Sequence, residues 1–236
     1  MEYYLTDTIY IKNNEMFSIV NHKHKPLKKY NWHLYLYDYG WRKLPKKWIS
    51  KINQLSDTTE KNSLFGILDV PHDGDCFFHC FAYIMNEKNN YLTNYTSNDI
   101  RKMISDSINE ETYLTMIHYY RIMKNANDFD ENWNPHEIHT LEDYQKQLNI
   151  SGNHYWADSL LLQHITQFFK INLIILQSDS TVYNTLLDFN KDYDTFIIML
   201  DIDLQHFQLV GYFNGKCMIS YIHSNSISSK ILKYFL

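Results

Sequence analysis

The sequence predicts an α+β fold in which a small central β-sheet is flanked by helices. Three apolar runs, at 172–176, 195–200 and 207–213, have the length and the Ile, Leu, Val and Phe content of buried strands. Other segments space their apolar residues three and four apart, which is typical of helices packed on a core. Strands and helices thus occur in one chain long enough for one substantial core.

Four helices are expected. An aromatic and aliphatic run from Phe77 to Met85 predicts a largely buried helix. Thr96-Ser97-Asn98-Asp99 has the pattern of a capping box, and an amphipathic stripe follows it at Ile100, Met103, Ile104 and Ile108. Further helices are predicted at 110–123 and, with similar capping, at 140–148. The polar segment 125–139, which contains Pro135, is predicted to be a loop.

A hairpin is predicted near the C-terminal end. The strand 207–213 is followed by Asn214-Gly215 and a second run at 216–221. Asn-Gly fits the type I′ turn that joins two antiparallel strands. This hairpin would hold the start of its first strand rigidly.

Charge and composition divide the chain. Residues 1–62 contain 11 Lys and Arg and 6 Asp and Glu, a net charge of +5, which leaves −10 on residues 63–236. Residues 32–41 are aromatic and strand-like, and a basic stretch follows at 42–48. We therefore predict a basic, aromatic N-terminal extension, residues 1–62, packed on the core of a main domain, residues 63–236. Binding of nucleic acid or a membrane surface by the extension is an alternative.

The chain is expected to work inside a cell. Three cysteines among 236 residues do not make a disulfide framework. Residues 1–4 do not begin a signal peptide, and no apolar run approaches the length of a membrane span. We predict an intracellular, cytoplasmic protein without a membrane partner. The abundance of Asn, Lys, Ile and Tyr favours an AT-rich genome, such as that of a large DNA virus or an intracellular microbe.

Cys76 is the candidate nucleophile. It lies between a turn that contains Gly74 and the aromatic helical run. A thiol in the first turn of a helix faces unpaired backbone N–H groups and the positive end of the helix dipole, and both favour the thiolate. Gly74 gives the turn backbone freedom, and Asp73 is placed to brace it. A buried, unreactive cysteine is the alternative.

His206 is the candidate base for this thiol. It follows a strand-like run and a short acidic loop, and it opens the predicted strand 207–213. A side chain at such a junction is well placed to reach a helix N-terminus, as a Cys/His pair requires. Most other histidines have ordinary explanations: His22, His24 and His33 fall in a basic N-terminal stretch, and His136 and His139 flank a polar loop that contains proline.

Three blocks give the chain a resemblance to the ovarian-tumour (OTU) family of cysteine proteases. The block 70–79 resembles the family's Asp-Gly-x-Cys-aromatic nucleophile block. The block from Trp156 to Gln163, with the strand that follows it, is similar to the family's Trp-led helix and strand. His206-Phe207 resembles the catalytic-histidine block. The three occur in the family's order, and the resemblance implies a papain-like cysteine protease architecture of the OTU type over residues 63–236.

The resemblance implies a deubiquitinase, an isopeptidase that cleaves ubiquitin or a ubiquitin-like modifier from conjugates. Cys76 would form the acyl-enzyme and His206 would transfer the protons, while backbone N–H groups of the turn 73–76 stabilise the oxyanion. An acidic domain would attract the arginines of the ubiquitin tail. No cofactor or metal is implied. The expected cleft residues are Gly74, Asp75, Trp156, Phe207 and Gln208.

The third catalytic residue departs from the family pattern. Many relatives have Asp or Asn two residues after the histidine, and this chain has Gln208 there. Its amide oxygen can accept an imidazole hydrogen bond, but it has no charge to stabilise an imidazolium. The candidates are Gln208, Asp73, Asp201 and Asp203, and Asp73 is assigned as the catalytic partner of Cys76 and His206.

Three alternatives follow from the sequence. Gln208 is consistent with a weak or inactive OTU-like protein that binds ubiquitin. The basic, aromatic N-terminus is consistent with a nucleic-acid or host-protein binding module, although the sequence disfavours a nucleic-acid partner. Zinc ligation by His72, Cys76, His79 and Cys80 is disfavoured, because these residues offer only a pair at helical spacing and no second pair at finger-like spacing follows.

Overall fold

The computed structural model divides the chain into two compact units. The sheet unit comprises Met1–Val70 and Ile171–Leu236, and the helical unit comprises Pro71–Lys170. The structure describes residues 2–59, 61, 63–129, 132–183, 189–223, 226 and 229–235. Residue 62, at the predicted domain boundary, and residues 130 and 131 of the predicted loop lie outside the described residues.

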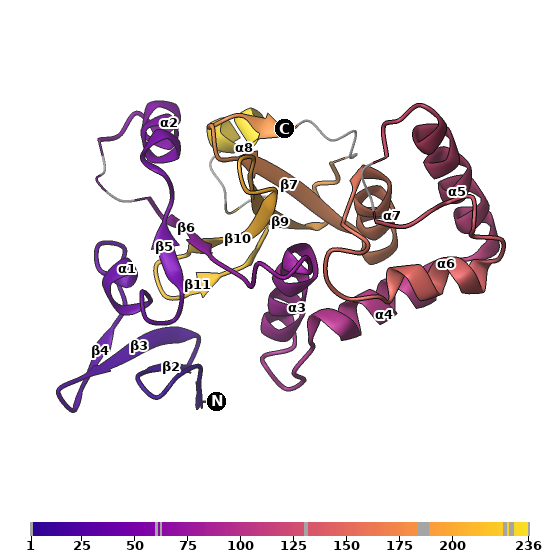
Figure 1. Ribbon diagram of the computed structural model, residues 1–236. Helices are drawn as coiled ribbons and strands as arrows, with labels where there is room; N and C mark the ends of the chain where they lie inside the picture. The colour runs from indigo at the N-terminus through magenta and orange to yellow at the C-terminus, as the bar shows by residue number, and fades with distance from the viewer. Residues whose placement is uncertain are drawn as a thin grey trace. The chain divides into compact units, whose positions relative to one another are not determined.

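A mixed sheet forms the centre of the sheet unit, and the α+β prediction is confirmed. Within the described ranges this sheet has eight strands, in the order β5-β6-β10-β9-β7-β8, with β11 paired to β10 and β12 paired to β9 (Figure 1). Among these described strands, only β7 and β9 run parallel; the other pairs are antiparallel. The strands are β5 Trp41–Lys43, β6 Phe65–Leu68, β7 Ile171–Gln177, β8 Val182–Tyr183, β9 Asp194–Asp201, β10 His206–Phe213, β11 Met218–Ile219 and β12 Tyr221–His223.

Two helices from distant parts of the chain contribute to the core around this sheet. Trp48 and Ile52 of α2 (Lys46–Ser56) and Ile231 and Phe235 of α8 (Ser229–Phe235) belong to one buried cluster with apolar residues of β6, β7, β9 and β10. Trp48 also donates its indole N–H to the Gln177 carbonyl at 2.8 Å. The predicted strands at 172–176, 195–200 and 207–213 are therefore real and lie in the core.

The first 43 residues differ from the prediction. A second sheet, β1-β2-β3-β4, spans Glu2–Tyr4, Ile9–Lys12, Glu15–Val20 and Lys23–Pro26. The sequence analysis did not predict it: β4 is fully exposed and β1 mostly so, which leaves little apolar signal there, whereas β2 and β3 carry apolar residues and were overlooked. The strand expected over 32–41 was wrong: α1 occupies Trp32–Tyr35, and only Trp41 begins a strand.

The predicted hairpin forms with a different turn. β10 and β11 pair antiparallel through Phe213 and Met218, so the loop has four residues, 214–217, rather than two. The Asn214 side chain accepts hydrogen bonds from the N–H groups of Lys216 and Cys217, each at 2.9 Å. The strand expected at 216–221 is broken at Ser220, since β12 pairs with β9.

The described part of the helical unit is built from five helices: α3 Cys76–Lys88, α4 Ser97–Ser107, α5 Glu110–Asn125, α6 Leu141–Leu148 and α7 Ser159–Phe169. The two predicted capping boxes are confirmed, at Thr96 with Asp99 and at Thr140 with Asp143. Helix α6 contacts both α4 and α5, and α5 runs at an angle to the other two (Figure 1). Tyr120, Tyr144 and Tyr155 are fully buried between them, and their hydroxyls hydrogen-bond at 2.6 and 2.7 Å.

No helix formed by the described residues combines the length and the apolar character needed to cross a bilayer. The three cysteines lie within the described residues and form no disulfide; Cys76 is partly exposed, and Cys80 and Cys217 are buried.

Candidate active site

Cys76 is the first residue of α3, as predicted. The residue before it, Asp75, is the N-cap, and its carbonyl accepts a hydrogen bond from the His79 N–H at 2.9 Å. The thiol is therefore in the first turn, where N–H groups have no intrahelical acceptor and the helix dipole is positive. Cys76 is partly exposed, so a reagent can reach it.

Gly74 is required by the shape of the loop 73–76, which we call the nucleophile loop. Its φ is +90°, in the region that favours glycine, and a Cβ there would collide with Asn153 and Gly152. The loop and the segment 151–155 are thus packed backbone to backbone.

Asp75 anchors the nucleophile loop on the rest of the helical unit. Its side chain is 5% exposed and pairs with Arg101 of α4, which is 0% exposed. The Arg101 Nε atom lies 2.8 Å from Asp75 Oδ1, and the Gly152 N–H donates to the same oxygen at 3.0 Å. Arg101 also donates to the Leu148 and Tyr155 carbonyls at 2.9 Å. A buried charge with this many partners fixes both segments, which gives Asp75 a structural task in addition to its predicted place at the cleft.

Asp73 contacts a histidine of its own unit. Its carboxylate lies 2.9 Å and 3.2 Å from His79 Nε2, and Oδ1 accepts the Asp75 N–H at 3.0 Å. Burial acts to raise the pKa of Asp73, but the hydrogen bonds from His79 and from the Asp75 N–H outweigh it and hold that pKa below its ordinary value. Asp73 is therefore an anionic brace of the nucleophile loop at neutral pH.

His206 lies in the sheet unit, as the first residue of β10. It is 3% exposed, and its Nε2 atom is 3.1 Å from Asp69 Oδ1. Gln208 donates its amide N–H to the same oxygen at 3.0 Å. Within this unit, the Asp69 carboxylate therefore contacts His206, and Gln208 contacts the same carboxylate; Asp201 lies opposite His206 on the neighbouring strand β9.

The strand register explains this arrangement. β10 pairs antiparallel with β6 through Leu209 and Leu68, so the next position places Gln208 opposite Asp69. Residues two apart on a strand share a face, and opposite residues on paired strands share it too. His206 and Gln208 consequently reach the same carboxylate at the end of β6.

This geometry defines which nitrogen of His206 can act as a base. Nε2 carries the hydrogen that is donated to Asp69, so Nδ1 holds the lone pair; the tautomer follows from the hydrogen bond. A carboxylate in this place orients the ring and stabilises the imidazolium after proton uptake.

Asp69 is the residue that sequence reasoning missed. Two of the sequence candidates have other partners: Asp73 contacts His79, and Asp201 accepts the Asp203 and Leu204 N–H groups of its own turn at 3.2 and 3.4 Å. Asp69 ends the apolar run 65–68, seven residues before Cys76. A polar residue at a strand end was the available signal, but recognising it required knowing that β6 pairs with β10.

The remaining predicted residues have defined surroundings. Trp156 is 38% exposed and therefore outside the core. It precedes α7, whose N-cap is Asp158, and that side chain accepts the Leu161 N–H at 2.9 Å. Phe207 is half-buried on β10. Their roles in substrate binding stay predictions.

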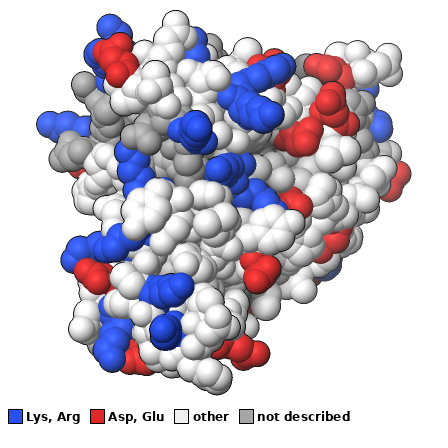
Figure 2. Space-filling view, turned by 90° about the vertical axis from the view of Figure 1, so that its left-hand side faces the viewer, with Lys and Arg blue, Asp and Glu red and all other residues white. Residues whose placement is uncertain are grey.

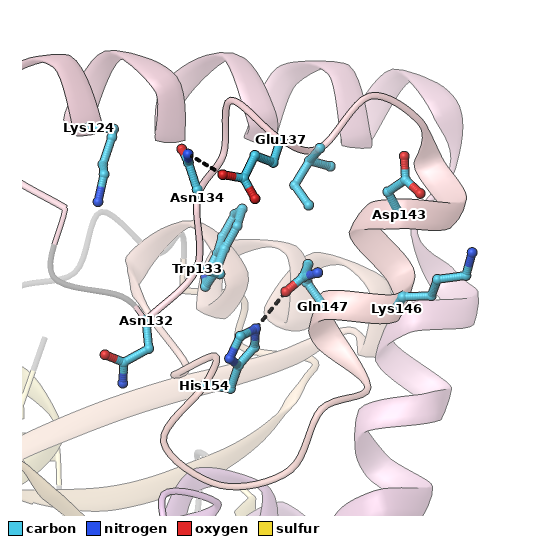
Figure 3. A pocket seen from close by; sticks show the side chains of 10 residues that line it. Lys124, Asn132, Trp133, Asn134, Glu137, Asp143, Lys146, Gln147 and His154 are labelled. Atoms are coloured by element: carbon cyan, nitrogen blue, oxygen red, sulfur yellow. Dashed lines mark hydrogen bonds between the residues drawn. The ribbon is translucent and has the colours of Figure 1, made fainter.

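A separate pocket of about 550 Å³ opens in the helical unit (Figure 3). Trp133 lies at its centre, and the dashed lines in Figure 3 join Asn134 to Glu137 and His154 to Gln147. None of the sequence-predicted site residues is among its described lining residues. Asn132 on its rim donates to the Asn153 carbonyl at 2.5 Å, and Asn153 borders Gly74. The rim of the pocket thus contacts the segment 151–155, which packs against the nucleophile loop.

A cysteine at a helix start and a histidine oriented by a carboxylate are the two kinds of residue that thiol-protease chemistry uses. The chain belongs to the OTU-like cysteine protease family: the family model matches residues 71–206, more than half of the sequence, from the residue after Val70 to His206. The papain-like, OTU-type fold expected from the sequence is thereby confirmed.

The chain is also similar to solved structures of this family. An ovarian-tumour domain in complex with ubiquitin is 14% identical, with 72% of this chain and 81% of that chain covered and a TM-score of 0.42. An OTU deubiquitinase from Wolbachia pipientis wMel is 14% identical, covering 72% and 94%, with a TM-score of 0.39. The viral OTU domain protease from Dera Ghazi Khan virus is 16% identical, covering 62% and 80%, with a TM-score of 0.35. No curated protein matches the chain.

Proposed function

We propose that the protein is a deubiquitinase, which hydrolyses the isopeptide bond between a lysine amine and ubiquitin or a ubiquitin-like modifier. The observation that carries the proposal is the family match over 71–206, which begins at the nucleophile loop and ends at His206. The positions of Cys76 at a helix start and of His206 beside Asp69 support it.

The chemistry uses Cys76 as the nucleophile and His206 as the base. The thiolate attacks the carbonyl carbon of the modifier's C-terminal residue, and the proton that leaves the thiol passes to His206. Collapse of the tetrahedral intermediate breaks the C–N bond, and His206 protonates the departing lysine amine. Water, deprotonated by His206, then hydrolyses the thioester and frees the modifier's carboxylate.

The other residues would support these steps. Asp69 would orient His206 and stabilise its protonated form, with Gln208 holding the Asp69 carboxylate. Backbone N–H groups at the start of α3 would bind the oxyanion, and Asp73 would brace the loop that carries them. We keep Gly74, Asp75, Trp156, Phe207 and Gln208 as the proposed cleft residues.

An active enzyme is favoured over an inactive ubiquitin-binding relative. The inactive alternative rested on Gln208, which lacks the charge found in many relatives. Asp69 lies within hydrogen-bond distance of His206 and offers that charge from the position that follows β6. The departure at Gln208 therefore no longer argues against turnover.

We further propose that residues 63–236 are the OTU-like catalytic domain and residues 1–62 its extension, in the cytoplasm of a host or within a virion. Lys and Arg side chains are spread over the face in Figure 2 with uncharged side chains between them. This spacing suits a solvated surface better than a continuous track for a nucleic-acid backbone. Ubiquitin and its conjugates are accordingly the proposed partners, with neither nucleic acid nor membrane.

Capture by ubiquitin with an electrophilic C-terminus tests the proposal. We expect the wild-type chain to form a covalent adduct that is heavier on a gel by the mass of one modifier, and Cys76→Ala to form none, because no other thiol takes its role. Cys217→Ala is the matched control, since Cys217 is buried and hydrogen-bonds to the Asn14 carbonyl. It should react like the wild type.

Two results would count against the proposal. Tight ubiquitin binding without capture would favour the inactive relative. If the chain neither binds nor captures ubiquitin, its substrate is a different modifier or its partner belongs to a different class. A panel of electrophilic ubiquitin-like modifiers separates the last two outcomes.

A further inference from the structure

His79 lies three residues after the nucleophile and has no part in the chemistry above. It is partly buried, with 24% of its side chain exposed, on the first turn of α3. Its imidazole is aimed back at the loop that precedes the helix, where Nε2 contacts both oxygens of the Asp73 carboxylate, at 2.9 and 3.2 Å.

The Asp73 carboxylate joins His79 to the backbone of the nucleophile loop. Its Oδ1 atom accepts the Asp75 N–H at 3.0 Å, and the Asp75 carbonyl accepts the His79 N–H at 2.9 Å. The nucleophile loop is therefore hydrogen-bonded to His79 of α3 at two points, once through the His79 backbone and once through its side chain. These bonds fix the peptide planes next to Cys76.

This side of the loop differs from the opposite side. There, the buried pair of Asp75 and Arg101 anchors the loop on α4 and on the segment 151–155. The Asp73 side chain, by contrast, is 51% exposed, so its carboxylate is held by its hydrogen bonds with His79 and the Asp75 N–H rather than by burial. Gly74, at φ +90°, lies between the two anchors and offers no stiffness of its own.

We propose that His79 is a positioning residue for the thiol chemistry: its hydrogen bonds to Asp73 hold the nucleophile loop in the shape that directs backbone N–H groups at the oxyanion. The inference rests on the proposed function for its catalytic readout. The proposed role requires a hydrogen-bond donor at position 79, and it does not require that the side chain gain or lose a proton during the reaction.

The catalytic test compares His79→Ala and His79→Gln with the wild type on a ubiquitin substrate. A misplaced oxyanion donor lowers the rate of the chemical step and leaves substrate binding unchanged, so we expect His79→Ala to lower kcat about three- to tenfold with KM within about twofold. The amide N–H of the glutamine side chain reaches about as far as Nε2 of the imidazole, so His79→Gln should recover most of kcat. His118→Ala, an exposed histidine on α5, is the matched control and should leave kcat unchanged.

A second measurement does not depend on ubiquitin. Because the Asp75 N–H donates to Asp73, its hydrogen exchange, followed by NMR, reports the brace directly. We expect faster exchange at Asp75 in His79→Ala and near wild-type exchange in His79→Gln. If the wild type fails to process ubiquitin, the proposed function fails, and the exchange rates still decide the role of His79.

Three outcomes would overturn the inference. Wild-type kcat and exchange in His79→Ala would show that the brace does not matter. Equal losses in His79→Ala and His79→Gln would show that the donor is not what matters. A loss in His79→Ala as complete as in Cys76→Ala would show that His79 takes part in the chemistry itself.

Discussion

The residues proposed for catalysis in the helical unit and in the sheet unit are held in place by different interactions. In the helical unit, the buried ion pair of Asp75 and Arg101 fixes the nucleophile loop. In the sheet unit, strand pairing places His206 and Gln208 on one face, and the Asp69 carboxylate that they share is 52% exposed. The nucleophile loop thus depends on buried charge, and the placement of His206 depends on the register of the strands. Substitution of the buried pair should therefore affect stability, whereas substitution of Asp69 should affect activity alone.

Removing the buried cation gives the largest expected effect. Arg101→Met leaves the Asp75 carboxylate buried without its partner, which typically costs about 3–5 kcal/mol. We expect a loss of that size in the free energy of unfolding, measured in urea by tryptophan fluorescence.

The neighbouring residue supplies the control. Lys102 forms an exposed pair with Asp106 at 2.9 Å, so Lys102→Met should cost less than about 0.5 kcal/mol. A loss below about 1 kcal/mol in Arg101→Met would mean that the loop does not depend on this charge.

The next largest effect is a loss of activity when Asp69 of the sheet unit is replaced. Asp69→Ala removes the carboxylate that orients His206, and we expect kcat/KM to fall about 10- to 100-fold. The roughly 10⁴-fold loss in serine enzymes should be an upper limit, because a thiol needs less help from its base. Since Asp69 is half-exposed, the unfolding free energy should change by less than about 1 kcal/mol.

Gln208 sharpens this prediction. Its amide donates to Asp69 and so acts through that carboxylate. Gln208→Ala should cost a few-fold in kcat/KM in the wild-type background and nothing further when Asp69 is already replaced by alanine. Additive losses would instead indicate that Gln208 contacts substrate or His206 by itself.

The smallest effect is a pH dependence confined to the helical unit. His164 hydrogen-bonds Ser107 at 2.8 Å, and the Ser107 hydroxyl donates to the Ile104 carbonyl, so the imidazole is the donor. Burial lowers the pKa of His164 below its ordinary 6.5. The unfolded chain thus takes up the proton first as pH falls, and stability decreases below about pH 6.5 until the folded protein is protonated too.

His164→Gln tests this dependence. The amide keeps a donor for Ser107 but does not titrate, so the free energy of unfolding should vary less between about pH 7 and pH 5 than in the wild type. Parallel curves for the two proteins would contradict the prediction. Because the other histidines are present in both proteins, the difference isolates His164.

The comparison also explains what the sequence could reveal. Cys76, Gly74 and the capping boxes at Thr96 and Thr140 are local patterns, in which a few adjacent residues determine the geometry. The contact of Asp69 with His206 joins residues 137 positions apart. No local pattern contains that information, since it depends on which strand pairs with β10.

The same reasoning applies to the parts of the fold that were missed. The sheet β1-β2-β3-β4 includes an edge strand, Lys23–Pro26, whose side chains are all exposed. Lys and Pro on an edge strand discourage pairing with other chains, and they also erase the alternation by which strands are recognised. The loop 214–217 forms because the Asn214 side chain caps two N–H groups, an option that the Asn-Gly pair does not exclude.

The pair of Asp75 and Arg101 restricts how this protein can change. Each charge is tolerated in the interior only while the other is present. A variant with a single substitution at either position is therefore expected to fold poorly. A neutral, well-packed replacement of both at once can be as stable as the original. In a library designed to alter specificity, positions 75 and 101 should therefore be varied together or left unchanged.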